Sequence, residues 1–409
     1  MANKKFKLVT FLGIRPDIIR TCRLLSMLDG GQAHHGYQHI YVHSGQHYDY
    51  VLDGVFRREL GVRQPDLNLH VGRTLKKRGI TDHVHQSALL FTKTAEMIEK
   101  LRPDGVLYLG DTNTVTSSLI VAKFGVAVIH IEGGGRSFDW RMPEEKNRIL
   151  VDHLSDTIYC YLPRYEKILL TEGIPPSRVV VVGNIIVDAL ESFIPLAERR
   201  PILKLMDLKE REYTLCTLHR EENIEDREIL ASKLEGLRQF SKTMRVVFPV
   251  MPRVQARIKK FGLEKLLKGG LIVCTKPLGF LDFLKLEMAS RLIITDSGTV
   301  QEEALILGIP CLVTRRSTER PETIAAGATI LADDDLCGNA HRALQMNINW
   351  NRNALNPGGG SPTERIYQDL TDRIRTGFFR KSRSFEMMKS NELARQSYGL
   401  DLGNLRLSI

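Results

Sequence analysis

The feature that most constrains the fold is a regular alternation of short apolar runs with longer helical stretches along most of the chain. The apolar runs are rich in β-branched residues and uniformly hydrophobic, which is typical of parallel strands covered on both faces. Helical stretches lie between them, for example Ser87–Leu101, Asp226–Phe240 and Thr299–Leu307. Repeated strand–helix units predict an α/β fold with parallel sheets and right-handed crossovers. The predicted strands are Lys7–Leu12, His39–His43, Gly105–Leu109, Ala127–Ile131, Thr157–Tyr161, Arg178–Val182, Tyr213–Leu218, Arg245–Val250, Gly270–Cys274, Arg291–Thr295, Pro310–Thr314 and Thr329–Ala332.

The length of 409 residues and a break in the alternation predict two doubly wound domains. Residues 195–212 contain two prolines and mixed charges, and a new strand–helix series begins at Tyr213. Near the other end, SPTE at residues 361–364 has the spacing of a capping box, which predicts a last clear helix over Thr363–Arg375. We therefore expect an N-terminal domain over residues 1–200, a C-terminal domain over 201–362, and a final segment, 363–409, with a helix that packs back on the first domain and a basic tail.

Composition and charge exclude several classes of protein. No apolar run approaches the roughly 18–20 residues that a membrane helix needs, and Arg15 interrupts the N-terminal apolar stretch too early for a signal peptide. The six cysteines lack metal-type spacing, which predicts free thiols, no metal and a reducing, cytoplasmic location. The net charge of +10 occurs without zinc-finger, RNP-type or helix-turn-helix patterns, so it favours an anionic ligand over nucleic acid.

Reactive side chains follow predicted strands of the first domain, at the sheet edge where doubly wound folds bind ligands. GIRPD at residues 13–17 places Arg15 and a proline at the turn into a helix, which suits a bound anion. Asp111 and Glu132 each follow a strand, and Glu144 opens the next helix. Each carboxylate alone also fits a helix cap or a partner of the helix dipole. Because they follow neighbouring strands of one sheet, the three could converge on one site.

The second domain offers groups that suit a nucleotide. His219 directly follows the first predicted strand of this domain. A lone histidine is more often structural, but one that faces a predicted cleft is as often catalytic. Ser297, Gly298 and Thr299 lie where a strand becomes a helix, and free N–H groups, hydroxyls and a glycine make a diphosphate cradle. Glu303 lies one turn into that helix, where it can accept hydrogen bonds from a ribose diol.

Further patterns narrow the choice of nucleotide-binding proteins. TERPE at residues 318–322 places Arg320 near another helix start. The sequence has no GxxxxGK[ST] motif, which argues against a Walker-type NTPase, and no GxGxxG after the first strand, which argues against a tightly bound NAD.

Eight of these motifs, in the same order and spacing, closely resemble the non-hydrolysing UDP-N-acetylglucosamine 2-epimerase family from about residue 6 to residue 376. The resemblance implies two Rossmann-like domains facing across a cleft in a GT-B-like fold. It also implies interconversion of UDP-GlcNAc and UDP-ManNAc without a cofactor, in a cytoplasmic homodimer that serves polysaccharide biosynthesis and binds neither nucleic acid nor membrane. The motifs are GIRPD, GQHYD, GDTNT, EGGGRS, MPEEKNR, HREEN, TDSGTVQEEA and TERPE.

The same resemblance assigns roles to individual residues. It matches Asp111, Glu132 and Glu144 with the catalytic carboxylates of the family, and His219 with its active-site histidine. Phe283 matches the aromatic residue that lies against uracil. The full set of expected substrate-binding residues is Arg15, Arg20, Arg148, Phe283, Ser297, Gly298, Thr299, Glu303 and Arg320.

Four positions depart from the usual family pattern. Arg20 is a lysine in many members, and Thr299 replaces the second glycine of the phosphate-binding turn. Met251 stands in place of a histidine and Tyr48 in place of an arginine, both near the region where some bacterial members bind a second, regulatory UDP-GlcNAc. Loss of that regulation is therefore expected. GQHYD and SFDWRMPEE also resemble relatives that act on modified UDP-sugars, so the sugar itself stays open.

The proposed chemistry explains the residue types. The C2 proton of the sugar is not next to a carbonyl, so the family eliminates UDP to give a glycal and then adds UDP back. This needs carboxylates as acid and base, cations that stabilise the diphosphate, and closure of the cleft. A hydrolysing 2-epimerase, a glycosyltransferase of the same fold and a non-catalytic binding protein are the alternatives. The proline of GIRPD favours the non-hydrolysing type, and the intact carboxylates and His219 favour an enzyme.

Overall fold

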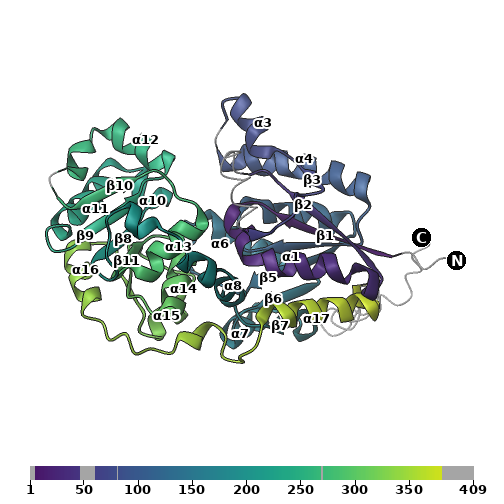
Figure 1. The fold of residues 1–409 in the computed structure, drawn as a ribbon. Coiled ribbons are helices and arrows are strands. Elements are labelled where there is room, and N and C mark those ends of the chain that lie inside the picture. The colour runs from purple at the N-terminus through teal and green to yellow at the C-terminus, as the bar shows by residue number, and fades with distance from the viewer. Residues whose placement is uncertain (1–4, 47–59, 81, 269, 380–409) are drawn as a thin grey trace.

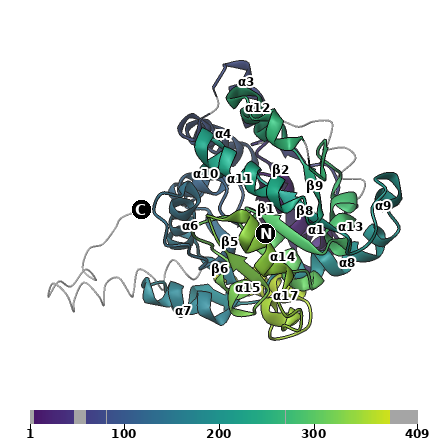
Figure 2. The same ribbon diagram turned by 90° about the vertical axis from the view of Figure 1, so that its left-hand side faces the viewer.

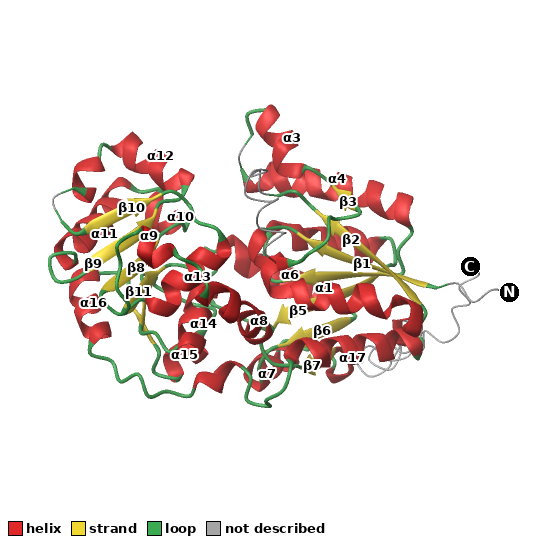
Figure 3. Ribbon diagram, in the orientation of Figure 1, coloured by secondary structure: helices red, strands yellow, loops and turns green. Residues whose placement is uncertain are grey.

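The structure is a computed structural model that describes residues 5–46, 60–80, 82–268 and 270–379. Two parallel sheets, each flanked by helices, form two α/β domains (Figures 1 and 3). The strand order is β3-β2-β1-β4-β5-β6-β7 in the first sheet and β10-β9-β8-β11-β12-β13 in the second. In both sheets the order reverses beside the first strand of the domain, which is the doubly wound topology. The predicted fold class is confirmed.

The first domain is built from a series of strand–helix units. Its strands are β1 (Phe6–Leu12), β2 (Tyr37–His43), β3 (Leu67–Asn68), β4 (Gly105–Leu109), β5 (Ala127–Gly133), β6 (Thr157–Cys160) and β7 (Val179–Val181). Its helices are α1 (Arg15–His35), α3 (Val71–Lys77), α4 (His83–Leu101), α5 (Ser118–Lys123), α6 (Pro143–Leu154), α7 (Pro163–Thr171) and α8 (Ile186–Glu198), and a short helix, α9 (Ile202–Leu205), leads into the second domain.

The second domain repeats the pattern with shorter strands. Its strands are β8 (Tyr213–Thr217), β9 (Arg245–Pro249), β10 (Ile272–Thr275), β11 (Leu292–Thr295), β12 (Cys311–Val313) and β13 (Thr329–Leu331). Its helices are α10 (Glu221–Ile224), α11 (Arg227–Phe240), α12 (Pro252–Phe261), α13 (Phe280–Ala289), α14 (Gly298–Leu307), α15 (Pro321–Ala325) and α16 (Leu336–Leu344), followed by α17 (Pro362–Arg375).

Every strand predicted from the sequence occurs, with ends that differ by at most two residues. The sequence analysis missed β3, which is only two residues long and pairs with the end of β2. Helix α4 begins four residues earlier than predicted, because the Asp82 side chain accepts the His85 N–H at 2.9 Å and caps the helix there.

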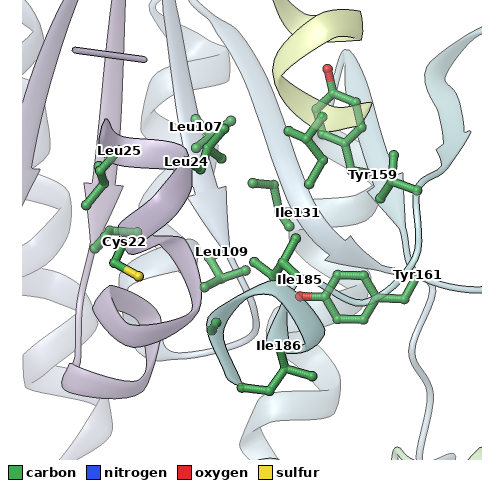
Figure 4. Packing of buried hydrophobic residues seen from close by; sticks show 14 of the residues in the cluster. Cys22, Leu24, Leu25, Leu107, Leu109, Ile131, Tyr159, Tyr161, Ile185 and Ile186 are labelled. Carbon is green, nitrogen blue, oxygen red and sulfur yellow. The ribbon is translucent and has the colours of Figure 1, made fainter. Parts of the chain in front are cut away.

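Apolar side chains from the helices cover the first sheet on both faces. Figure 4 shows one side of this packing, where Leu24 of α1 and Ile186 of α8 lie with Leu109 of β4 and Ile131 of β5. All four are at most 2% exposed. Burial on both faces explains why the strands read as continuous apolar runs rather than as alternating ones.

The C-terminal helix α17 lies beside α1 of the first domain, at the end of the molecule opposite α3 and α12 (Figures 1 and 2). Ser361 caps α17 by accepting the Glu364 N–H at 3.1 Å, as the sequence predicts. The Glu364 carboxylate binds Arg23 of α1. Asp188 of α8 accepts both the Ser361 hydroxyl, at 2.9 Å, and the Thr363 N–H, at 2.7 Å. A single buried carboxylate thus fixes the start of the helix.

All six cysteines are free, and Cys22, Cys160, Cys216 and Cys311 are buried, whereas Cys274 is exposed. Within the described residues, no helix is long and apolar enough to cross a membrane.

We expect the Ser361→Ala variant to lower the free energy of unfolding by about 1–2 kcal/mol, because it removes the cap of α17 and the hydroxyl donor to buried Asp188. Urea denaturation followed by circular dichroism measures the loss. The exposed Ser177→Ala is the control and should change stability by less than about 0.5 kcal/mol. If the two substitutions lowered the free energy of unfolding equally, the result would contradict a stabilising role of the Ser361–Asp188 hydrogen bond.

Candidate active site

The predicted site residues follow strands β1, β4 and β5 of the first domain and β8, β10, β11 and β12 of the second. Side chains from the two domains contact each other directly: the Arg220 guanidinium lies 3.3 Å from Glu144, and Arg320 binds Glu132. The ends of the two sheets therefore meet at one polar junction in this structure.

Glu132 is the most constrained of the three carboxylates. Its backbone has a φ of 78°, a left-handed conformation that a non-glycine residue rarely adopts, at an irregularity in the pairing of β5 with β6. Its side chain is 7% exposed and binds two guanidiniums, Arg20 from α1 and Arg320 from the turn before α15. The hydroxyl of Tyr161 approaches it at 3.5 Å. Strain of this kind concentrates at functional sites.

Asp111 lies in the turn after β4 and receives both Nε (2.8 Å) and one terminal nitrogen (2.6 Å) of Arg148 from α6. Burial opposes ionisation of the carboxyl, but Arg148, together with Arg220 and Arg320, outweighs it, so the pKa of Asp111 is lowered. The preceding residue, Gly110, has a φ of 71° and its carbonyl accepts a hydrogen bond from the buried His130 ring at 2.8 Å. The hydrogen bond from His130 thus holds the backbone next to Asp111 in place.

Glu144 stands in the first turn of α6, where a carboxylate also interacts favourably with the helix dipole. About a third of its side chain is exposed, 32%, and its partner is Arg220 from the second domain. Its neighbour Glu145 faces inward and binds Arg148 at 2.6 Å. Of the three predicted carboxylates, Glu144 has the most exposed side chain.

His219 follows β8, and its ring Nδ1 donates to the buried carboxylate of Asp296 at 2.9 Å. Asp296 also accepts the backbone N–H groups of His219 and Arg220 and the Asn223 side-chain amide, at 2.9–3.1 Å. Burial opposes ionisation of Asp296, but the contact with His219 and these hydrogen bonds lower its pKa. With Nδ1 engaged and 44% of the side chain exposed, the Nε2 of His219 is left for a ligand.

The predicted diphosphate cradle is the start of α14. Ser297 is the N-cap, and its hydroxyl accepts the Val300 N–H at 3.4 Å. A Cβ at Gly298 would lie 2.5 Å from the Glu319 carboxylate, so any larger residue here would have to displace that side chain. A helix N-terminus with a small residue at its first position can approach an anion closely.

Glu303, the predicted ribose ligand, is 4% exposed and lies against the fully buried Glu287 of α13. Burial raises the pKa of Glu303 to about 7, with Glu287 and Arg20 opposing the rise. Burial also raises the pKa of Glu287, and the adjacent Glu303 adds to the effect. Phe283, half-buried on the same helix α13, packs against the apolar core of the second domain.

The remaining predicted residues lie at helix starts or outside the described residues. Arg15 begins α1 and is half-buried, and Thr299 is the second residue of α14. Met251 is the N-cap of α12 and is 42% exposed. Tyr48 lies outside the described residues. Within these residues, no group of three His, Cys, Asp or Glu side chains is arranged to hold a metal ion.

The sequence analysis missed several charged residues of the junction. They are Arg220, Glu302 and Glu319, which make ion pairs with the predicted site residues Glu144, Arg320 and Arg148, respectively. Each stands next to a selected residue within a motif, namely HREEN, TDSGTVQEEA or TERPE. Their position in these motifs could have indicated that they belong to the site. Their ion-pair partners could not be predicted, because most of them lie far away in the sequence.

Comparison with known proteins gives a consistent result. A family model described as UDP-N-acetylglucosamine 2-epimerase matches residues 31–370. A UDP-N-acetylglucosamine 2-epimerase of Methanococcus maripaludis is 36% identical over 375 residues, which cover 89% of this chain and 98% of that protein. A UDP-2,3-diacetamido-2,3-dideoxy-D-glucuronate 2-epimerase of Pseudomonas aeruginosa is 33% identical over 373 residues, covering 89% and 99%.

The solved structures agree with the sequence matches. The crystal structure of the Methanocaldococcus jannaschii UDP-GlcNAc 2-epimerase in complex with UDP-GlcNAc and UDP aligns with a TM-score of 0.82 at 36% identity. The alignment covers 90% of this chain and 99% of that one. The family resemblance and the GT-B-like fold expected from the sequence are both confirmed.

We expect the Asp296→Asn variant to lose about 3 kcal/mol of stability at neutral pH, because an amide cannot replace the carboxylate that accepts every donor around it. Since the pKa of Asp296 is lowered in the folded state, its contribution is fully present above the unfolded pKa of about 3.9 and is lost at lower pH. The difference in the free energy of unfolding between the wild type and Asp296→Asn should therefore stay constant between about pH 5 and 8 and decrease below about pH 4.

Urea denaturation over this pH range is the measurement. Asp282→Asn, which breaks the more exposed pair with Arg200, is the matched control and should cost less than about 1 kcal/mol. If the stability difference between the wild type and Asp296→Asn increased on acidification, the result would contradict the ionised state of Asp296.

Proposed function

The chain belongs to the UDP-N-acetylglucosamine 2-epimerase family, and we propose that it is a non-hydrolysing member that interconverts UDP-GlcNAc and UDP-ManNAc. The observation that carries the proposal is the polar junction itself. Asp111, Glu132 and Glu144 meet there with His219 and the start of α14, and each carboxylate is paired with a guanidinium. Proton transfer on two faces of a sugar, next to a departing diphosphate, needs this combination.

In this proposal the second domain binds the nucleotide. The N–H groups of Gly298 and Thr299 and the Ser297 hydroxyl hold the diphosphate, and Glu303 accepts hydrogen bonds from the ribose hydroxyls. Phe283 of α13 lies against the uracil ring. The acetamido sugar then extends toward the carboxylates of the first domain.

The reaction proceeds by elimination and re-addition. A carboxylate takes the proton from C2, the C1–O bond breaks and its electron pair leaves with UDP, and a C1=C2 double bond remains in the glycal. UDP then attacks C1 again while a carboxyl group delivers a proton to the opposite face of C2. Arg148, Arg220 and the helix N–H groups stabilise the second negative charge on the departing UDP. His219, oriented by Asp296, offers Nε2 to the same region.

The substrate proposal takes account of one specific alternative. The Pseudomonas relative acts, by its name, on a UDP-2,3-diacetamido-2,3-dideoxy-D-glucuronate, and the chain is nearly as similar to it as to the archaeal relative. Both substrates share the 2-acetamido group and UDP, so the same elimination serves either one. Hydrolysis to free ManNAc is the other alternative, which the proline of GIRPD disfavours.

The setting of the enzyme is also part of the proposal. The six free cysteines support a reducing cytoplasmic location. The family resemblance supports a homodimer that supplies an activated sugar for polysaccharide synthesis. No cofactor or metal has a step in the proposed reaction.

We expect the enzyme to incorporate solvent deuterium at C2 of both UDP-GlcNAc and UDP-ManNAc when it is incubated with UDP-GlcNAc in deuterated water without NAD. Formation of the glycal removes the original C2 proton from the UDP-sugar, and re-addition takes a new proton from a group that exchanges with solvent. Proton NMR of the two nucleotide sugars measures the exchange. Accumulation of free ManNAc and UDP would support the hydrolysing alternative, and turnover only of the diacetamido-glucuronate would correct the substrate.

We expect Asp111→Asn, Glu132→Gln and Glu144→Gln each to lower turnover by at least about 10²-fold, the usual contribution of a general acid or base. UDP affinity, measured by calorimetry, should stay within about threefold because the nucleotide binds the second domain. Glu172→Gln is the matched control: it breaks a pair with Arg136 at 2.7 Å in the same domain and should leave turnover within about twofold. Near-normal turnover of all three variants would remove these carboxylates from the mechanism.

A further inference from the structure

One buried carboxylate at the junction has no role in the scheme above. Glu319 lies between β12 and α15, in the TERPE segment, and is 2% exposed. Its oxygens lie 3.0 Å from Arg315, 3.6 Å from Arg220 and 3.9 Å from Arg148. The first two arginines belong to the second domain and Arg148 to the first, so Glu319 attracts guanidiniums from both.

Three of the arginines in this region, Arg148, Arg220 and Arg320, each also bind one of the proposed reactive carboxylates. Arg148 binds Asp111 and Arg220 binds Glu144. Arg320, which follows Glu319 directly in the chain, binds Glu132 and also contributes to the electrostatic environment of Glu319. Asp111 and Glu144 are therefore each linked to Glu319 through one guanidinium, and the charge of Arg320, the partner of Glu132, favours the ionised form of Glu319.

Glu319 also touches the proposed diphosphate cradle. Its Oε1 lies so close to Gly298 that a Cβ there would meet it at 2.5 Å. A fixed negative charge at this place repels a bound diphosphate, since charges of like sign at a few ångströms interact unfavourably even in a polar surrounding. A carboxylate at this position thus lowers the affinity for the nucleotide, and it must bring another advantage that offsets the lost affinity.

The charge balance of the junction shows what that advantage is. Burial opposes ionisation of Glu319, but Arg315 and the other guanidiniums outweigh it and lower its pKa well below the usual range. Glu319 in turn raises the pKa of Asp111 against the lowering effect of Arg148. Without this central charge, the arginines would hold the reactive carboxylates more tightly in their ionised form.

We propose that Glu319 is a positioning residue that orients Arg148 and Arg220, and through them Asp111 and Glu144, at the expense of UDP affinity. The inference rests on the proposed epimerase function and adds a residue to it. Glu319 does not itself exchange a proton with the sugar. It fixes the arginines at the distances from which they both present the carboxylates and receive the departing UDP.

The test is the Glu319→Gln variant, which keeps the shape and removes the charge. We expect its kcat to fall by at least about tenfold, because the arginines lose their common anchor and the carboxylates move. We expect its Kd for UDP, measured by calorimetry, to fall by at least about threefold, because a repulsive charge beside the cradle is gone. A merely structural role would weaken both properties, so the opposite signs identify the positioning role.

Two further variants keep the result interpretable. Glu319→Asp keeps the negative charge but moves it away from the arginines, because its side chain is shorter. It should therefore lower kcat while UDP affinity stays within about twofold. This variant replaces Glu319→Gln as the test if Glu319→Gln does not fold. Glu322→Gln is the matched control, since Glu322 is a buried acid of the same segment whose carboxylate accepts the Tyr165 hydroxyl at 2.8–2.9 Å. It should leave kcat and UDP affinity within about threefold.

The outcomes separate this inference from the proposed function. A wild-type protein that does not epimerise would contradict the function, while the UDP affinity of Glu319→Gln would still decide the role of Glu319. UDP affinity of this variant that is unchanged or weaker overturns the inference. So does a kcat within twofold of the wild type.

Discussion

The arrangement of this molecule depends on the cost of burying carboxylates where two domains meet. Removing one partner from a buried ion pair leaves an uncompensated charge and costs about 3–5 kcal/mol, which is a large part of the stability of a typical domain. Glu132 meets this constraint with Arg20 of its own domain and Arg320 of the other. Glu144 is about a third exposed, so its burial costs less, and it is paired with Arg220 of the other domain. Charge compensation at the junction is therefore complete only when the domains are together, which links the approach of the domains to the assembly of the site.

These charged residues lie in turns at the ends of parallel strands, and buried hydrogen bonds hold the turns in place. The buried His130 illustrates how. Its two ring nitrogens contact the Asp152 carboxylate and the Gly110 carbonyl, each at 2.8 Å, so both nitrogens face acceptors. Asp152 also accepts the Gly134 N–H at 3.1 Å, two residues after Glu132. One buried pair thus holds the turn that presents Asp111 and the turn that follows the strained Glu132, which lets an unfavourable backbone conformation persist.

The sequence predicted those parts of the molecule that depend on local pattern. Uniformly apolar runs located the strands, and because the carboxyl ends of parallel strands share one edge, the pattern by itself placed Asp111 and Glu132 near each other. The helix start at Ser361 followed from its capping residues. Strand β3 was missed because two residues carry no periodicity. Glu319 was missed because its importance lies in partners that stand far away along the chain, such as Arg148, and no spacing rule connects them.

The balance of charge at the junction bears directly on the proposed chemistry. A carboxylate that is held tightly by an arginine is a weak base, since the ion pair favours the ionised form and lowers the pKa, as Asp111 shows. A UDP-sugar brings two further negative charges to the same arginines. Their arrival shields the guanidiniums and raises the proton affinity of the neighbouring carboxyl groups, because like charges disfavour ionisation. In the proposed reaction, entry of the substrate therefore shifts these carboxyl groups toward the pKa range in which proton transfer is efficient.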